Sequence, residues 1–220
     1  MIKTEILKLS SGNRNQALLQ RAAELIKQGG VVAFPTETVY ALGADAMKES
    51  AVQKVFLLKK RLSGKPVAIF LPQAEDLKNF VEEITPSARK LMEKFWPGPL
   101  TLIFKPKPGK MAFLTGEEEK LGVRVSSSNF VQSLLRMTGT ALTATSANLS
   151  GKPEPASAEQ VLDYFDGKIN LVIDGGASES ATPSSVVDVS GEMPVLLREG
   201  RIPFAELKRV VPELERKNEE

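Results

Sequence analysis

The stretch ALLQRAAELIKQGGVVAF, residues 17–34, decides the fold class of this chain. Its apolar residues between positions 18 and 26 recur at the spacing of one helix face, which predicts a helix over 17–27. Gly29 and Gly30 then end the helix, as glycines do just past a helix C-terminus. The next four residues, 31–34, are all apolar and predict a short buried strand. A helix, a glycine turn and a buried strand in this order indicate an α/β protein.

The same alternation continues through the rest of the sequence. Further helices are predicted over 50–60, with Ser50 as N-cap, and over 86–95, with Thr85 as N-cap. Another helix is predicted after 126–129, any of which can be its N-cap, and a last one over 158–165, with Ser157 before it. Further strands are predicted at 67–71, 100–105, 122–125, 141–145, 171–173, 185–189 and 195–198. Ser190–Gly191 suggests a tight turn that would join the last two strands as a hairpin.

No linker or internal repeat divides the chain. Helices and strands alternate, but not as a strict series of β-α units. We therefore expect a single domain over 1–220, an α/β fold with a twisted mixed sheet flanked by helices. Its core would cover about 17–202, followed by a C-terminal tail of about 203–220 whose charged end, 215–220, is expected to fray.

Composition excludes several classes of protein and of chemistry. The 220 residues include 29 Lys plus Arg and 27 Asp plus Glu, a net charge of +2, with 42% hydrophobic and 25% charged residues, as in globular proteins. No apolar run reaches the roughly 20 residues of a membrane span, and the N-terminus lacks a signal-peptide core, so a cytoplasmic protein without membrane association is expected. Cysteine and histidine are both absent, which excludes thiolate and Ser-His-Asp catalysis and histidine metal sites.

Five polar clusters follow or precede the predicted strands, where ligands of α/β proteins bind. They are 35–40, 59–66, 143–151, 182–185 and 198–201. The cluster 59–66 carries Lys59, Lys60, Arg61 and Lys65, which suits a polyanion such as a triphosphate; a solvated helix end is the alternative. The small residues of 143–151 let a ligand approach the backbone, or they form an ordinary Ser/Asn/Gly turn.

Three other features are less specific. Arg124 stands in an apolar strand, so it must meet either a carboxylate or an anionic ligand. The motif WPGP, 96–99, is interpreted as architecture that fixes the exit from a helix. The sequence DGG, 174–176, is interpreted as a turn in the first place and as a metal contact only in the second.

In this order, the clusters resemble the threonylcarbamoyl-adenylate synthase family, the YrdC-like proteins, over about 17–202. The motifs that carry the resemblance are PTETVY (35–40), Lys59-x-Arg61, WPGPLT (96–101), Arg124-Val125, TSANLSG (145–151), SSVVD (184–188) and Leu197-Arg198-x-Gly200. The resemblance is to the single-domain form of the family, and it implies a twisted mixed sheet with a deep basic cavity.

The resemblance also implies an activity. Such proteins are nucleotidyltransferases that convert L-threonine, bicarbonate and ATP into threonylcarbamoyl-AMP and pyrophosphate. Mg²⁺ arrives with ATP, and no protein nucleophile or protein-bound metal is needed. A threonylcarbamoyl-transferase complex then modifies tRNA, so tRNA or double-stranded RNA is an expected partner.

Site residues follow from the resemblance position by position. The threonine site would comprise Thr36, Thr38, Tyr40, Arg124, Ala144 and Ser184. The ATP site would comprise Lys59, Arg61, Lys65, Ser146, Asn148 and Arg198. Among these, Arg61, Arg124 and Arg198 would stabilise developing negative charge.

The sequence departs from the family pattern at a few positions. Phe70 stands where many members have His, Ala41 where Gly is frequent, Leu62 where Pro is common and Ser185 where Thr is frequent. Two other functions stay open. One is a non-catalytic module for double-stranded RNA or tRNA, although the 6% aromatic content disfavours stacking on single strands. The other is a sensor that binds amino acid and nucleotide without releasing pyrophosphate.

Overall fold

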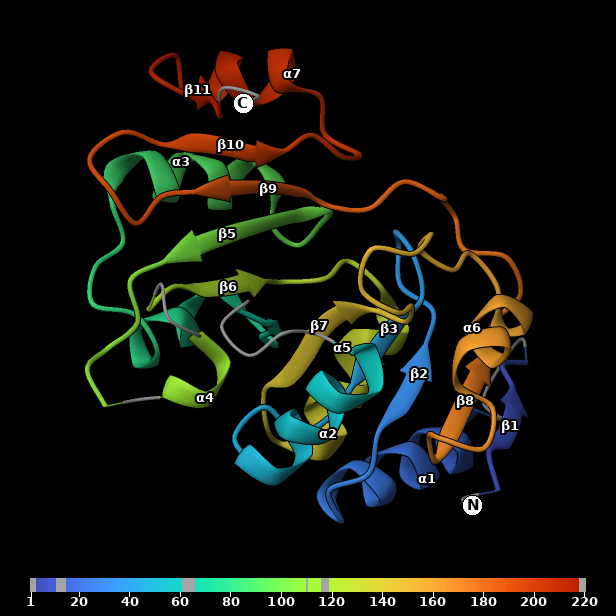
Figure 1. The fold of residues 1–220 in the computed structure, drawn as a ribbon. Helices are drawn as coiled ribbons and strands as arrows, with labels where there is room; N and C mark the ends of the chain where they lie inside the picture. Colours follow the sequence, from blue (N-terminus) through green and yellow to red (C-terminus); the bar gives the residue numbers. More distant parts are fainter. Residues whose placement is uncertain (1–2, 11–14, 61–65, 110, 116–118, 218–220) are drawn as a thin grey trace.

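The computed structural model describes residues 3–10, 15–60, 66–109, 111–115 and 119–217. Within them, eleven strands form one sheet in the order β1-β8-β2-β3-β7-β4-β6-β5-β9-β10-β11 (Figure 1). The strands are β1 (Glu5–Lys8), β2 (Val32–Phe34), β3 (Ala41–Gly43), β4 (Ala68–Phe70), β5 (Leu100–Phe104), β6 (Leu121–Arg124), β7 (Leu142–Ser146), β8 (Leu171–Asp174), β9 (Ser185–Asp188), β10 (Val195–Arg198) and β11 (Glu215–Arg216).

The sheet mixes parallel and antiparallel pairs, as the sequence predicts. For example, β2 pairs in parallel with β8 and antiparallel with β3. The predicted terminal hairpin is present, because β9 and β10 pair antiparallel. The single-domain, mixed α/β fold is therefore confirmed.

Helices pack on both faces of the sheet. They are α1 (Asn15–Lys27), α2 (Glu49–Lys59), α3 (Pro86–Phe95), α4 (Ala112–Thr115), α5 (Asn129–Thr138), α6 (Ala158–Phe165) and α7 (Phe204–Val210), with a 3₁₀ helix at Ala74–Asn79. Strand β2 shows how the faces divide, because successive side chains of a strand point to opposite faces. Val32 and Phe34 pack with α1 and α5, whereas Ala33 packs with α2 and α6.

Most of the predicted helix starts are confirmed by their caps. The side chains of Thr85, Ser128 and Ser157 accept hydrogen bonds from the backbone N–H three residues later, at the starts of α3, α5 and α6. Ser50 is not the N-cap of α2, contrary to prediction. That helix begins at Glu49, and its capping position, Lys48, makes no side-chain cap.

Ordered structure extends beyond the predicted core at both ends. Strand β1 pairs in parallel with β8. At the other end, α7 buries Leu207, and Leu214 is also fully buried in the same apolar cluster. The expectation that residues 215–216 fray is wrong, because Leu214 anchors them and β11 pairs with β10.

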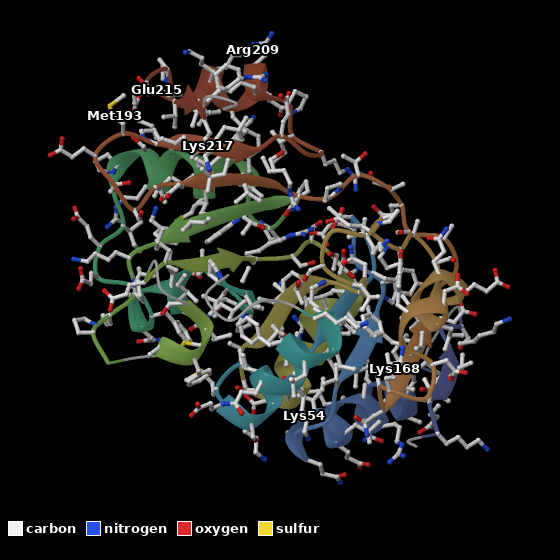
Figure 2. The ribbon with its side chains drawn as sticks, in the orientation of Figure 1. Lys54, Lys168, Met193, Arg209, Glu215 and Lys217 are labelled. Atoms are coloured by element: carbon white, nitrogen blue, oxygen red, sulfur yellow. The ribbon has the colours of Figure 1, made fainter. Side chains whose placement is uncertain are left out.

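Charged side chains cover the outside of the fold (Figure 2). Lys54 on α2 donates to the carbonyl of Gly29, and Lys168 after α6 donates to the carbonyl of Tyr164. Both cations thus lie near a helix C-terminus, where positive charge is favoured. In the part of the chain that the structure describes, no helix has the length and apolarity to span a bilayer.

Candidate functional site

A cavity of about 300 Å³ opens on one face of the sheet, beside β3, β7, β4, β6, β5 and β9. Its floor is made of small residues that face the same way on neighbouring strands, namely Ala41, Ala144, Ala68 and Gly122. Polar side chains from distant segments surround this floor. They include Thr36, Thr38, Arg124, Ser146, Ser184 and Arg198, all of them predicted site residues.

A second cavity, of about 640 Å³, adjoins the first. The two share Ser146, Glu154, Pro183 and Arg198 as lining residues. Lys59, Asn148 and the loop 150–153 complete the second cavity. Together the cavities provide a hydroxyl-rich compartment and a more open compartment with several cations.

Arg124 on β6 is the central cation of the first cavity. Its Nη2 lies 2.9 Å from Glu37 Oε1, its Nε donates to the carbonyl of Gly98, and Nη1 and Nη2 both donate to Thr38 Oγ1. Of the two partners that the sequence leaves open, the structure shows a carboxylate, Glu37, and an anionic ligand beside Arg124 stays a prediction. The WPGP motif also contributes to the site, because the carbonyl of Gly98 accepts the hydrogen bond from Nε of Arg124 and so helps to orient the guanidinium.

Glu37, which is not among the predicted site residues, lies at the site as the partner of Arg124. It accepts hydrogen bonds from Ser126 Oγ at 2.5 Å and from the backbone N–H of Ser127 at 2.9 Å. Burial raises the pKa of Glu37, but Arg124 and these donors lower it by more, so it lies below its ordinary 4.5. Burial lowers the pKa of Arg124 while Glu37 raises it, and a guanidinium stays protonated in proteins. The pair is therefore ionised and holds Arg124 in one orientation.

Arg198 at the end of β10 is held just as specifically. Its Nε and Nη2 donate to the carbonyl of Ser184 at 3.2 and 3.0 Å. Ser184 Oγ lies 2.9 Å from Thr101 Oγ1, a second lining hydroxyl that the sequence analysis passed over. The resulting group of hydroxyls and one cation suits a small polar ligand with a negative charge.

Lys59 at the end of α2 fixes the loop after β7. Its buried ammonium donates to the carbonyls of Ser146 and Asn148 at 2.5 and 2.9 Å and to Asn148 Oδ1 at 3.0 Å. Asn148 Oδ1 also accepts from Ser146 Oγ at 2.7 Å. Lys59, Ser146 and Asn148, predicted separately as nucleotide contacts, thus form one connected network.

Tyr40 does not line the cavity, so the structure does not bring it together with the other predicted threonine contacts. Val39 and Ala41 line the cavity, and Tyr40 between them points to the opposite side, where its hydroxyl donates to the carbonyl of Gly176 at 2.6 Å. Phe70 does line the cavity, and its ring centroid lies 5.7 Å from the guanidinium carbon of Arg124.

Arg61 and Lys65 lie outside the described residues, and so does Leu62. The basic character of the cavity therefore stays a prediction. Among the residues that the structure describes, no group of three or more Asp or Glu side chains is arranged to hold a metal ion.

Comparison with known proteins agrees with this geometry. The Sua5/YciO/YrdC family model, described as "Telomere recombination", matches residues 24–200. The chain belongs to the Sua5/YciO/YrdC family. The match spans every predicted site residue, from Thr36 to Arg198.

Individual relatives in the Sua5/YciO/YrdC family are similar in sequence and structure. The chain is 40% identical over 193 residues to the threonylcarbamoyl-AMP synthase of Pyrococcus abyssi and 37% identical over 198 residues to that of Bacillus subtilis. These matches cover 88% and 90% of the chain but 57% of each relative, so the chain spans little more than half their length. The crystal structure of P. abyssi Sua5 complexed with L-threonine superposes with a TM-score of 0.93 at 37% identity, over 97% of this chain and 63% of that one.

Proposed function

We propose that this protein makes threonylcarbamoyl-AMP from L-threonine, bicarbonate and ATP, releasing pyrophosphate. The observation that carries the proposal is the convergence of Thr36, Thr38, Arg124, Ser184 and Arg198 on one cavity. The similar P. abyssi Sua5 was solved in complex with L-threonine, and the similar P. abyssi and B. subtilis relatives are named threonylcarbamoyl-AMP synthases.

Two steps make up the proposed reaction. The amine of threonine attacks bicarbonate to give a carbamate and water. A carbamate oxygen then attacks the α-phosphorus of ATP, and the α–β phosphoanhydride bond breaks to release pyrophosphate. Neither step needs a protein nucleophile, which fits a chain without histidine or cysteine.

The first cavity would hold the amino acid in this scheme. Arg124, with its orientation fixed by Glu37, would face the carboxylate or the carbamate, and the hydroxyls of Thr36, Thr38 and Ser184 would surround the polar side chain. Donors held in fixed positions in a half-enclosed cavity, here the guanidinium of Arg124 and the lining hydroxyls, stabilise developing negative charge more than the same groups do in water.

The second cavity would hold the nucleotide. Its cations include Lys152 and Arg198, with Lys59 holding the Ser146–Asn148 loop in place. Arg61 and Lys65 are proposed to add phosphate contacts, and Mg²⁺ enters as part of the nucleotide substrate. A threonylcarbamoyl-transferase complex and tRNA are the proposed downstream partners.

The direct test incubates pure protein with Mg²⁺, ATP, bicarbonate and isotopically labelled L-threonine. Mass spectrometry should detect the labelled mixed anhydride, and omission of bicarbonate should abolish it. Binding of both ligands without any anhydride or pyrophosphate would instead identify a sensor. Binding of RNA that ignores threonine and falls steeply with salt would identify an RNA-binding module.

A further inference from the structure

Glu154 lies where the two cavities meet and lines both of them. Among the lining residues that the structure describes, it is the one carboxylate, and it belongs to both cavities. It lies in the loop between β7 and α6, on the sequence Pro153-Glu154-Pro155. A ligand that occupies both cavities would therefore lie near this carboxylate.

The backbone on both sides of Glu154 is anchored. The carbonyl of Pro153 accepts a hydrogen bond from the Tyr164 hydroxyl at 3.2 Å, and the carbonyl of Pro155 accepts one from the Tyr40 N–H at 2.9 Å. The two prolines further restrict the backbone, because their rings fix φ. Glu154 is thus held at the junction by its surroundings, and Tyr40 serves the site indirectly through this loop.

Arg198 presents one edge of its guanidinium to Glu154. Its Nε and Nη2 are committed to the carbonyl of Ser184, whereas Nη1 lies 3.4 Å from Glu154 Oε1. Since the Ser184 contacts fix the plane of the group, an anion arriving from the second cavity meets the same edge. Glu154 and such an anion compete for it.

The Glu154–Arg198 pair is too exposed to be an important structural contact. The Arg198 side chain is 45% exposed and that of Glu154 is 22% exposed, and ion pairs with this exposure contribute little to stability. The carboxylate therefore acts on what binds beside it more than on the fold.

A triphosphate lying across the junction would place several negative charges next to Glu154. Negative charges at such a short distance from each other, in a partly enclosed site, oppose binding. A magnesium ion removes the conflict, because Mg²⁺ is bound in proteins by one or two carboxylates together with substrate phosphates. The carboxylate oxygens of Glu154 are therefore suitable ligands for the Mg²⁺ that accompanies a nucleotide.

We propose that Glu154 makes this site select the magnesium complex of a nucleoside triphosphate over the metal-free nucleotide. This inference rests on the proposed function, because it takes the ligand of the second cavity to be a nucleotide. Glu154 is then a specificity-determining residue: it repels free triphosphate and accepts the triphosphate whose charge is partly neutralised.

Isothermal titration calorimetry with the β,γ-imido analogue of ATP tests the proposal without turnover. Each protein is titrated once with Mg²⁺ in excess and once with EDTA. The variants are Glu154→Gln and the matched control Glu179→Gln, whose carboxylate pairs with Arg201 at 3.8 Å and is 74% exposed outside both cavities.

For the wild type and the control, removal of Mg²⁺ should weaken binding by at least about tenfold, the effect of one nearby like charge. For Glu154→Gln the same removal should weaken binding less than about threefold, mainly because the metal-free analogue binds more tightly. An unchanged magnesium dependence in Glu154→Gln, or an equal loss of affinity in both buffers, would overturn the proposal. If the wild type binds the analogue in neither buffer, the proposed function itself fails.

Discussion

Replacing Glu37 with glutamine should destabilise the protein severely, because it strips a buried cation of its counter-charge. The side chains of Glu37 and Arg124 are 5% and 7% exposed. Removing one partner of a buried pair costs about 3–5 kcal/mol, since the remaining charge is left uncompensated. That is a large share of a typical unfolding free energy of about 5–15 kcal/mol.

Urea unfolding measures this loss. The single tryptophan, Trp96, is a suitable fluorescent probe because it is buried and lies two residues before Gly98, whose carbonyl accepts from Arg124. With a urea dependence of about 2–3 kcal/mol per molar, the midpoint should fall by about 1–2.5 M. The control Glu179→Gln should shift the unfolding free energy by less than about 0.5 kcal/mol, as an exposed pair does.

A double variant separates charge from packing. Glu37→Leu combined with Arg124→Met removes both charges, so it should be more stable than Glu37→Leu alone. A cost below about 1 kcal/mol for Glu37→Gln would refute the reasoning, because it would mean that Arg124 needs no buried counter-charge.

Acid should remove the same contribution in the wild type. The pKa of Glu37 in the folded protein lies below its ordinary 4.5, so its contribution is fully present above that value and is lost as pH falls through the folded pKa. The stability gap between wild type and Glu37→Gln should therefore be constant near neutral pH and close in acid. A gap that widens in acid would show that folding raises the pKa of Glu37 instead of lowering it.

Three further predictions concern the site and its frame. Arg198→Ala and Arg61→Ala should each lower threonine-dependent pyrophosphate release at least about tenfold, equivalent to about 1.4 kcal/mol of transition-state stabilisation; unchanged turnover in both would remove these residues from the site. Lys59→Met should speed hydrogen exchange in the 146–152 loop, because its ammonium bonds to Ser146 and Asn148; exchange as slow as in the wild type would contradict this role. Gly43→Ala should lower stability by about 1–3 kcal/mol, because an added Cβ would collide with the Phe34 ring, whereas Gly191→Ala, with open space around it, should not.

The sequence predicted those parts of the fold that local signals determine. The predicted helix caps at Thr85 and Ser157 need only neighbouring residues, and both are present; within 126–129, where the sequence leaves the cap open, Ser128 is the cap. Strand β1 was missed because its four residues show no strong alternation and their partner, β8, lies far along the chain. Helix α7 was missed because its apolar side is recognisable only against the core that receives Leu207.

The same division applies to the site. The resemblance selected Thr38, Arg124 and Arg198, and the structure brings all three to one cavity. The motifs did not identify Glu37 as the partner of Arg124, since the two are far apart in sequence, although a carboxylate inside the 35–40 cluster was a usable signal. The side chain of Tyr40 turns away from the cavity, and this orientation was not predictable because a motif gives the identity of a side chain but not the face to which it points.

A crystal structure with L-threonine and the β,γ-imido analogue of ATP tests the central claim most directly. Threonine should lie among Thr36, Thr38, Arg124 and Ser184, with the triphosphate reaching the Nη1 edge of Arg198 through the shared opening. Ligands bound on separate faces of the protein, or threonine away from Arg124, would contradict this claim.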